Sequence, residues 1–267
     1  MRCGSIFICE IQPFSWDIPT AELYESNQLE EIIGRLNYAA ELQLFAVMTA
    51  ECGLGKMTAI RRFTDQLDPS RFKLLYLSDS KLTPRHFYKG MLEQLGLESK
   101  FYRGDAKCQL HREIELMKGI HKLTPVCVVD EAHLLDREML EEVLFLLNFR
   151  MDAQSLMALI MVGQTELWDC LQFQSFAAIR QRIDIQFRLH HLDRAETEQY
   201  MIQHLAYAGV GSDIFSKSAI DEVFNYSSGA SRLINKLATH CLLFAAQNGN
   251  RIIDDRMVKK VIEGELA

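Results

Sequence analysis

The sequence lacks any apolar run close to the roughly 18 to 20 residues that a membrane-spanning helix needs, so it predicts no membrane segment. Its N-terminus, with Glu10 and two cysteines, makes a poor signal peptide. The seven cysteines lie far apart and include no C-x-x-C pair, which disfavours disulfides and zinc sites. Internal repeats and low-complexity stretches are missing too. We therefore expect a soluble cytoplasmic protein with free thiols.

Positive charge is also scarce. The chain carries 29 Lys and Arg against 36 Asp and Glu, a net charge of −7, which argues against nonspecific nucleic-acid affinity over the whole surface. Between Lys56 and Lys122, however, 14 basic residues stand against 8 acidic ones, so this segment has a net charge of +6 and the rest of the chain −13. Such a local excess is usually a solvated helix face, and charge alone assigns it no partner.

Residues 50–57, Ala-Glu-Cys-Gly-Leu-Gly-Lys-Met, contain most of the phosphate-binding pattern G-x-x-x-x-G-K-[ST]. In such a loop the glycines let backbone N–H groups surround phosphate oxygens, and the lysine reaches the β and γ oxygens. Gly53, Gly55 and Lys56 occupy three of the defining positions. We expect a nucleotide to contact the loop and the residue after it, namely Glu51, Cys52, Gly53, Leu54, Gly55, Lys56, Met57 and Thr58.

Two positions of this pattern are changed. Ala50 replaces the first glycine, which is tolerable where the local φ is negative. Met57 replaces the hydroxyl that ligates Mg²⁺, and a thioether is a poor ligand for this hard cation. Thr58 is the nearest hydroxyl, but neighbouring side chains on a helix diverge by roughly 100°. The loop therefore predicts nucleotide binding and leaves hydrolysis open, and an ordinary strand-to-helix glycine turn is the alternative.

The surrounding sequence favours the nucleotide site. Residues 44–49 are a short apolar run typical of a buried parallel strand, and residues 56–67 have helical periodicity. Residues 126–129 predict a second buried strand that ends at Asp130 and Glu131. The first carboxylate can hold the hydration shell of Mg²⁺ and the second can polarise an attacking water. An acidic pair alone is often a solvated strand end, but parallel strands place it at the same sheet edge as the loop.

Strand and helix signals alternate over most of the chain. Besides the two strands above, the predicted elements are strands at 72–77, 156–162 and 183–189 and helices at 84–95, 107–123 and 137–147. This alternation predicts a three-layer α/β/α fold around a parallel five-stranded sheet, as in P-loop NTPases. Strand signals end after Asp193, and four helices are predicted at 196–208, 217–226, 231–248 and 254–264. We expect a nucleotide-binding core at 1–192, with a lead-in at 1–40, and a small all-helical domain at 193–267.

Further short motifs occur in order from about Gln12 to the C-terminus. They are Pro13-Phe14, Asp17-Ile18-Pro19, Leu23-Tyr24-Glu25-Ser26, Arg35-Leu36-Asn37-Tyr38-Ala39, Asp130-Glu131-Ala132-His133-Leu134-Leu135, Leu146-Leu147-Asn148-Phe149, Val162-Gly163-Gln164-Thr165-Glu166-Leu167, Arg180-Gln181-Arg182-Ile183 and Ser228-Gly229-Ala230-Ser231-Arg232-Leu233-Ile234-Asn235. In these motifs the chain resembles the ExeA/GspA-type AAA+ ATPases, close to the ATPase subunits of transposition systems such as TnsC and MuB. Ala50, Met57 and the first eleven residues depart from the family pattern.

The resemblance implies roles for three residues outside the loop and the acidic pair. Gln164 matches the polar sensor near the γ-phosphate, with a strand-end amide as the alternative. Arg182 matches the arginine that reaches the nucleotide of a neighbouring subunit, with Arg180 as its substitute and a surface ion pair as the alternative. Arg232 matches the sensor arginine of the helical lid.

The resemblance also implies ATP and Mg²⁺ as cofactors and a homo-oligomer, either a ring or a filament. In transposition ATPases the region that corresponds to the residues after the predicted strand at 72–77 faces double-stranded DNA. The candidates for DNA contact are Lys81, Arg85, Lys89, Lys100 and Arg103. The predicted function is an ATP-binding AAA+ switch or assembly factor, a DNA-binding transposition helper that acts with a transposase.

Two other functions remain as alternatives. One is a secretion or envelope-assembly ATPase of the ExeA type. Against it we count the end of this chain at Ala267, directly after the expected lid, with neither a membrane segment nor a wall-binding domain. The other is a hydrolysis-dead interaction module that holds a nucleotide as a structural cofactor, which Met57 supports.

Overall fold

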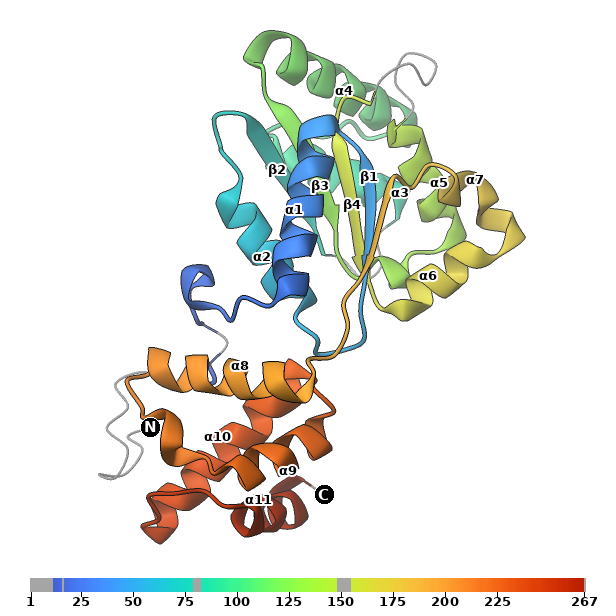
Figure 1. The fold of residues 1–267 in the computed structure, drawn as a ribbon. Helices are drawn as coiled ribbons and strands as arrows, with labels where there is room; N and C mark the ends of the chain where they lie inside the picture. The colour runs from blue at the N-terminus through green and yellow to red at the C-terminus, as the bar shows by residue number, and fades with distance from the viewer. Residues whose placement is uncertain (1–11, 16, 79–82, 148–154, 267) are drawn as a thin grey trace. The chain divides into compact units, whose positions relative to one another are not determined.

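The protein is described by a computed structural model that places residues 12–15, 17–78, 83–147 and 155–266 (Figure 1). The described chain forms two compact units. The sheet unit comprises residues 28–52 and 59–189, and the helical unit comprises residues 12–27, the segment Gly53–Thr58 and residues 190–266. None of the described helices combines the length and apolarity of a membrane span.

The sheet unit is built on five parallel strands in the order β2-β3-β4-β1-β5. Their bounds are β1 Phe45–Thr49, β2 Phe72–Leu77, β3 Thr124–Val129, β4 Ala158–Gly163 and β5 Ile185–Arg188. Every residue of β1 and β4 is buried, because each strand has a neighbour on both sides and helices over both faces. The edge strand β5 alternates buried and exposed positions. The predicted five-stranded parallel sheet is confirmed.

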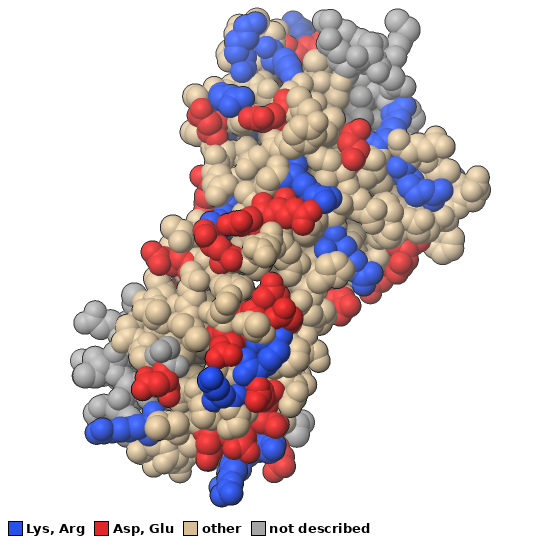
Figure 2. Space-filling model, viewed as in Figure 1, with Lys and Arg blue, Asp and Glu red and all other residues tan. Residues whose placement is uncertain are grey.

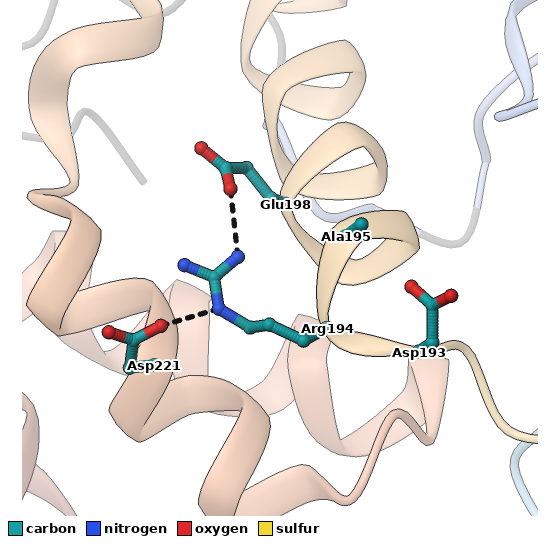
Figure 3. Close-up of a pocket in the computed structure, with 5 residues that line it drawn as sticks. All are labelled: Asp193, Arg194, Ala195, Glu198 and Asp221. Atoms are coloured by element: carbon teal, nitrogen blue, oxygen red, sulfur yellow. Dashed lines mark hydrogen bonds and ion pairs between the residues drawn. The ribbon is translucent and has the colours of Figure 1, made fainter.

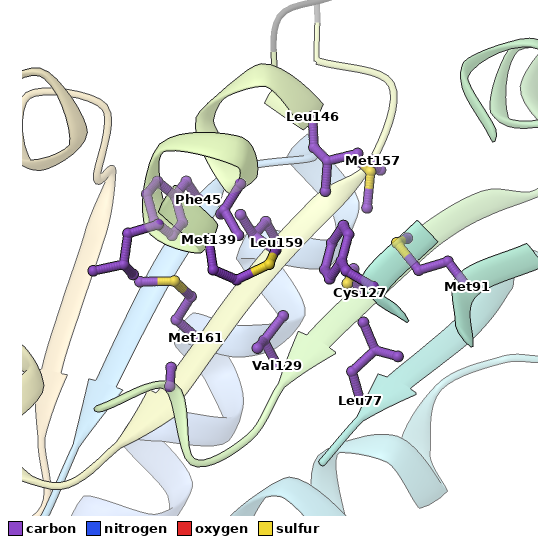
Figure 4. Close-up of a cluster of buried hydrophobic side chains, with 14 of the residues drawn as sticks. Phe45, Leu77, Met91, Cys127, Val129, Met139, Leu146, Met157, Leu159 and Met161 are labelled. Atoms are coloured by element: carbon purple, nitrogen blue, oxygen red, sulfur yellow. The ribbon is translucent and has the colours of Figure 1, made fainter. Parts of the chain in front are cut away.

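Helices cover both faces of this sheet. Side chains alternate between the faces, and one face, with Phe45, Cys127 and Met161, packs in a single hydrophobic cluster (Figure 4). The helices of that cluster are α3 Pro84–Gln94, α4 Arg103–Leu116, α5 Arg137–Leu147, α6 Thr165–Gln172 and α7 Ala177–Arg180. On the other face lie α1, Asn27–Leu42, and α2, Lys56–Gln66 (Figure 1). The result is the three-layer α/β/α arrangement.

Some helices differ from the prediction. The helix predicted at 107–123 begins at Arg103, because the side chain of Arg103 pairs with α5 and stabilises a first turn that Gly104 weakens locally. It continues as a π-helical turn, Met117–His121, and ends at Lys122 with a φ of 58°. The sequence analysis predicted no helix at α1, α6 or α7. The latter two have only eight and four residues and depend on packing against the sheet unit.

The helical unit contains the four predicted helices. They are α8 Arg194–Tyr207, α9 Lys217–Ser227, α10 Ser231–Asn248 and α11 Asp255–Val261, and a π-helical turn at Ile262–Leu266 follows α11. Side-chain caps set three of the helix starts, since Asp193, Ser216 and Asp254 each accept a hydrogen bond from a backbone N–H in the first turn. Between α8 and α9, Arg194 pairs with both Glu198 and Asp221 (Figure 3).

The segment before α1 belongs to the helical unit and packs on α8. The ring of Phe14 stacks on the imidazole of His204, with centroids 5.5 Å apart. Burial lowers the pKa of His204 to about 4, so the ring is neutral and its Nδ1–H donates to the carbonyl of Pro13 at 3.1 Å. The hydroxyl of Tyr24 donates to Gln199 at 2.9 Å. A segment that is far from α8 in sequence thus completes the core of this unit.

Candidate nucleotide site

The backbone of the phosphate-binding loop explains which glycines it needs. Gly53 has a φ of 85° and Gly55 a φ of 93°, values that side chains with a Cβ rarely adopt. Ala50 is not among the positive-φ residues of the described chain, and it is fully buried with its N–H donating to the carbonyl of Gly163 at 3.2 Å. Alanine is therefore compatible with the first position of the pattern, whereas the other two glycines are required.

The loop contacts the first turn of α10 within the helical unit. The carbonyl of Gly53 accepts hydrogen bonds from the Oγ of Ser231 at 2.9 Å and from the N–H of Arg232 at 3.1 Å. A Cβ built on Gly53 would lie 2.9 Å from the Cβ of Arg232. Only glycine permits this approach, and it places the predicted lid arginine directly beside the loop. The sequence analysis did not single out Ser231, whose only signal was its place before Arg232.

A glycine also fixes where α10 begins. Ser228 and Gly229, at the end of α9, have φ values of 48° and 80°. A Cβ on Gly229 would lie only 1.9 Å from the carbonyl oxygen of Leu192, and the carbonyl of Gly229 accepts the N–H of Leu192 at 3.1 Å. This turn against Leu192 sets the direction in which Ser231 and Arg232 leave toward the loop.

The start of α2 has the features of an anion site. Lys56 is its first residue, and the first turn contains no acidic side chain, so an anion at the positive end of the helix would meet no acidic residue of that turn. Met57 is 43% exposed, and its thioether adds no oxygen ligand. Thr58 is half-buried, and its Oγ1 would lie 4.0 Å from a Cβ built on Gly55. A hydroxyl therefore lies close to the loop backbone, one residue later than the pattern requires.

Asp130 follows β3 and is held at both carboxylate oxygens. Its Oδ1 accepts the N–H of Glu131 at 2.8 Å, and its Oδ2 accepts the hydroxyl of Tyr76 at 2.9 Å. Burial and the hydrogen bond to Asp130 raise the pKa of Tyr76 well above its usual value, so this phenol is a permanent donor. The side-chain amide of Gln94 in turn bonds both the N–H and the carbonyl of Tyr76, at 2.8 and 2.7 Å. Asp130 is thus oriented before any ligand arrives.

The sequence analysis missed Tyr76. The available signal was a polar aromatic residue at the next-to-last position of an apolar strand. The strand register pairs Tyr76 with Val128 of β3, which brings its hydroxyl within reach of Asp130. That register is not visible in a local pattern, because it depends on which strand lies beside β2.

Glu131 and Gln164 lie at the same sheet edge, and the side chains of both contact His133. Glu131 adopts a left-handed backbone with a φ of 50°. The Nδ1 of His133 lies 3.4 Å from the Oε2 of Glu131, and its Nε2 lies 3.0 Å from the side-chain nitrogen of Gln164. The structure therefore brings the predicted base and the predicted sensor together through His133, to which the sequence analysis gave no catalytic role.

The carboxyl ends of three strands define this edge. Thr49 of β1 is paired with Gly163 of β4, and Val129 of β3 is paired with Met161. Among the described residues, no group of three or more His, Cys, Asp or Glu could hold a metal ion. Any cation here would take most of its ligands from phosphate and water, and Mg²⁺ commonly binds to proteins in this way. One oriented carboxylate, with water and phosphate oxygens as the remaining ligands, fits that cation.

The two candidate arginines before β5 have different surroundings. The Nη1 of Arg180 donates hydrogen bonds to two backbone carbonyls of α6, that of Leu171 at 2.8 Å and that of Gln172 at 2.9 Å. Arg182 is half-buried in the turn that leads into β5. Arg180 therefore has a structural role within the sheet unit.

Of the predicted DNA contacts, Arg85 and Lys89 lie on α3, Arg103 begins α4, and Lys100 lies between these helices. Lys81 lies outside the described residues. The guanidinium of Arg85 lies 4.5 Å from the centroid of Phe101, Lys89 pairs with Glu93 at 3.5 Å, and Lys100 is exposed. On the face shown in Figure 2, basic side chains are interspersed with acidic ones.

Arg103 has strong internal partners. Its guanidinium bonds Glu138 at 2.6 Å and also bonds Glu142, whose side chain is 2% exposed. Glu142 is further held by Lys107 at 3.0 Å and by the hydroxyl of Tyr88. Arg103 is therefore part of a network that joins α3, α4 and α5, which favours a structural role over contact with DNA.

The sheet order, the glycine loop between β1 and α2, the acidic pair after β3 and the helical unit define a P-loop protein of the AAA+ fold class. Residues 40–171 match the family described as an AAA domain. Over 263 residues the chain is 28% identical to General secretion pathway protein A (GspA) of Aeromonas hydrophila. That similarity covers 96% of this chain and 45% of GspA, so the chain spans about half the length of its relative.

Solved structures are similar to the chain in fold. The Drosophila ORC bound to DNA matches with a TM-score of 0.73 and 15% identity, covering 96% of this chain and 64% of that one. Cdc6p from Pyrobaculum aerophilum matches with a TM-score of 0.68 and 14% identity, covering 90% and 67%. The RuvB Holliday junction branch migration motor of Thermotoga maritima matches with a TM-score of 0.59 and 18% identity, covering 88% and 68%. The AAA domain and GspA matches support the resemblance to ExeA/GspA-type ATPases and do not extend to TnsC or MuB.

Proposed function

We propose that the protein is an ATP-binding AAA+ module that acts as a nucleotide-dependent switch or assembly factor. The observation that carries this proposal is the loop itself. Gly53 and Gly55 adopt positive φ, Lys56 opens α2, and the first turn of that helix has no acidic residue. Backbone N–H groups and a lysine arranged in this way bind phosphate. Glu51, Cys52 and Leu54 complete the loop around the nucleotide.

The residues at the sheet edge have distinct tasks in this proposal. Asp130 would hold Mg²⁺ through its hydration shell, and the ion would neutralise charge on the phosphates. Glu131 accepts the proton of the attacking water, and Gln164 contacts the γ-phosphate. Arg182 stabilises charge on the nucleotide of a neighbouring subunit, and Arg232 couples nucleotide state to the helical unit. Because position 57 is a methionine and has no hydroxyl, we expect ATP hydrolysis to be slow. In the extreme, the module would bind ATP and not hydrolyse it.

The biological role that we favour is that of a secretion or envelope-assembly ATPase. This follows from the similarity to General secretion pathway protein A, which extends over 96% of this chain. We further propose that the module forms a homo-oligomer, because an arginine in the position of Arg182 acts in the site of another copy.

ATP-dependent self-association tests this function. We expect the mass measured by light scattering to rise with Mg²⁺ and a slowly hydrolysed ATP analogue, and to stay lower with ADP. Arg182→Ala should lose the response, whereas Arg137→Ala should keep it, because Arg137 forms an exposed pair with Glu141 on α5. Equal masses with and without nucleotide would contradict a nucleotide-dependent assembly factor.

The transposition helper is the second candidate, and the basic excess between Lys56 and Lys122 is the observation that supports it. If double-stranded DNA and a transposase are the partners, DNA affinity should require ATP and fall steeply with salt, with a log-log slope of roughly 0.9 per neutralised phosphate. Arg85→Glu with Lys100→Glu should reduce that slope, and Lys260→Glu, an exposed lysine of the helical unit, should not. No binding at low salt with ATP would exclude this role.

A further inference from the structure

His133 lies between Gln164, which would contact the γ-phosphate, and Glu131, which would accept the proton of the attacking water. Its Nδ1 is 3.4 Å from the Oε2 of Glu131, and its Nε2 is 3.0 Å from the side-chain nitrogen of Gln164. The backbone N–H of Gln164 also points at Nδ1, at 3.4 Å. The imidazole is 10% exposed and Glu131 is 40% exposed, so the histidine is enclosed while the carboxylate reaches solvent.

The backbone builds this contact. Glu131 has a φ of 50°, and a 3-10 turn, Ala132–Leu134, follows it. A Cβ on Gly163 would lie 3.1 Å from the backbone nitrogen of His133, so the missing side chain at the end of β4 lets the turn pack closely. Ala132 is fully buried beneath it. Packing therefore fixes the position of the imidazole at the strand end. What can change is which of its two nitrogen atoms carries a hydrogen.

A neutral imidazole has one donor nitrogen and one acceptor nitrogen. In the first tautomer, Nδ1–H donates to the Glu131 carboxylate, and Nε2 accepts from the side-chain N–H of Gln164. In the second, Nε2–H donates to the side-chain oxygen of Gln164, and Nδ1 accepts the backbone N–H of Gln164. Glu131 is a hydrogen-bond partner of His133 only in the first tautomer.

The orientation of the Gln164 amide selects the tautomer. When its NH₂ group donates to a γ-phosphate, its oxygen turns toward His133, and Nε2 must carry a proton. Solvent takes the proton from Nδ1 and supplies one to Nε2, so the number of protons on the ring does not change. Nδ1 then has no hydrogen to donate, and Glu131 is released to accept the proton of the attacking water.

We propose that His133 is a positioning residue that releases Glu131 when Gln164 contacts a γ-phosphate, by exchanging one imidazole tautomer for the other. This relay rests on the nucleotide site proposed above, and it adds regulation to that site. It predicts that Glu131 is restrained without nucleotide and with ADP, and freed with ATP.

Nitrogen-15 NMR of the histidine side chains tests the relay, because it distinguishes the two tautomers. The His133 signals are assigned by their loss in His133→Gln. We expect the Nδ1–H form without nucleotide and with Mg²⁺-ADP, and the Nε2–H form with Mg²⁺ and adenylyl-imidodiphosphate. Gln164→Ala should bind both nucleotides and show no tautomer change. Binding of both without any tautomer difference would overturn the relay alone, and failure of either to bind would overturn the nucleotide site and the relay with it.

Two substitutions separate the contacts of His133 in hydrolysis. In His133→Asn the amide nitrogen takes the place of Nδ1 and keeps its bond to Glu131, whereas in His133→Gln it takes the place of Nε2 and leaves Glu131 free. With Met57→Thr present in both proteins, kcat should be about tenfold higher for the Gln variant, with similar KM values. A merely structural histidine predicts equal kcat values or the reverse order, and either result would overturn the relay.

Discussion

Individual residues of the loop separate binding from hydrolysis. In the proposed site, Gly53, Gly55 and Lys56 would supply the backbone shape and charge that bind phosphate, and none of them depends on the side chain at position 57. Met57 affects only the ligation of the cation. Binding and turnover are therefore expected to respond to different substitutions.

Restoring an oxygen ligand should reveal hydrolysis. We expect turnover of the natural sequence near background, and we expect Met57→Thr to raise it by about tenfold or more, which corresponds to roughly 1.4 kcal/mol of transition-state stabilisation. Affinity for Mg²⁺ in the presence of nucleotide should increase in parallel. Phosphate release and Mg²⁺ titration measure the two effects.

Glu131→Gln provides the control for this prediction. Added to Met57→Thr, it should abolish the gain, because the attacking water loses its base. Brisk, Glu131-dependent hydrolysis by the natural sequence would show that Thr58 or another oxygen replaces the missing ligand.

Tyr76→Phe should loosen Asp130 while keeping the ring. Losing the hydrogen bond from the Tyr76 hydroxyl, worth about 1 kcal/mol, should raise the Mg²⁺ concentration at half-saturation about fivefold. Nucleotide affinity without Mg²⁺ should not change. Tyr38→Phe, at a tyrosine that is 56% exposed on α1, is the matched control. An unchanged Mg²⁺ requirement would show that Asp130 is oriented without Tyr76.

Side-chain partners were the least predictable part of the site. The loop and the acidic pair could be located because each is a local pattern next to a buried strand. Tyr76 and His133 acquire their partners through strand order and through a close approach at Gly163. Neither of these is encoded within a few neighbouring residues.

At the scale of elements, burial decides what the sequence predicts. The strands and α5, α9 and α10 follow clear apolar periodicities, and their predicted bounds agree closely with the structure. The prediction placed the start of α4 four residues late, because that turn depends on ion pairs with α5. Tertiary contacts of this kind override local propensity.

Gly229→Ala should destabilise the helical unit. It combines a φ of 80° with a Cβ placed 1.9 Å from the Leu192 carbonyl oxygen, so the turn between α9 and α10 and the backbone of Leu192 must move apart. We expect a loss of at least about 2 kcal/mol in the free energy of unfolding. Gly209→Ala shares the positive φ, 71°, but its Cβ would meet open space, and it should cost only about 1 kcal/mol. Equal losses in denaturant titrations would contradict the close approach at Leu192.

The Glu142 network should make stability depend on pH. Burial raises the pKa of Glu142, but hydrogen bonds from Tyr88, Lys107 and Arg103 outweigh this and hold it below its ordinary value of 4.5. A lowered folded pKa stabilises the protein above 4.5, and that contribution is lost as the pH falls through the folded pKa. Glu142→Gln should therefore lower stability at neutral pH and flatten its decline in acid.

Glu93→Gln is the control for this network. Glu93 pairs with Lys89 at the surface, both side chains being more than half exposed, so the change should cost less than about 0.5 kcal/mol. The measurement is urea unfolding of both variants between neutral pH and pH 3. An unaltered acid response in Glu142→Gln would show that other carboxylates control it.

On the scale of the whole molecule, several observations agree on the fold class, whereas the biological role remains a proposal. The order of five strands, the AAA domain match and the helical unit agree on the fold class, which the sequence predicted correctly. The sequence analysis favoured transposition, whereas the proposed secretion role starts from the similarity to General secretion pathway protein A. Charge counts could not decide between these roles, because the basic residues of α3 and α4 include Lys89 and Arg103, which pair with neighbouring acids.

Equilibrium binding of a fluorescent ATP analogue tests the central claim, that residues 50–57 form a nucleotide site. The account predicts saturable binding by the natural sequence, a loss of at least about tenfold in affinity for Lys56→Ala, and no more than a twofold change for Lys89→Ala, which removes an exposed lysine of α3. Equal affinities for the natural sequence and Lys56→Ala, or no binding by either, would contradict it.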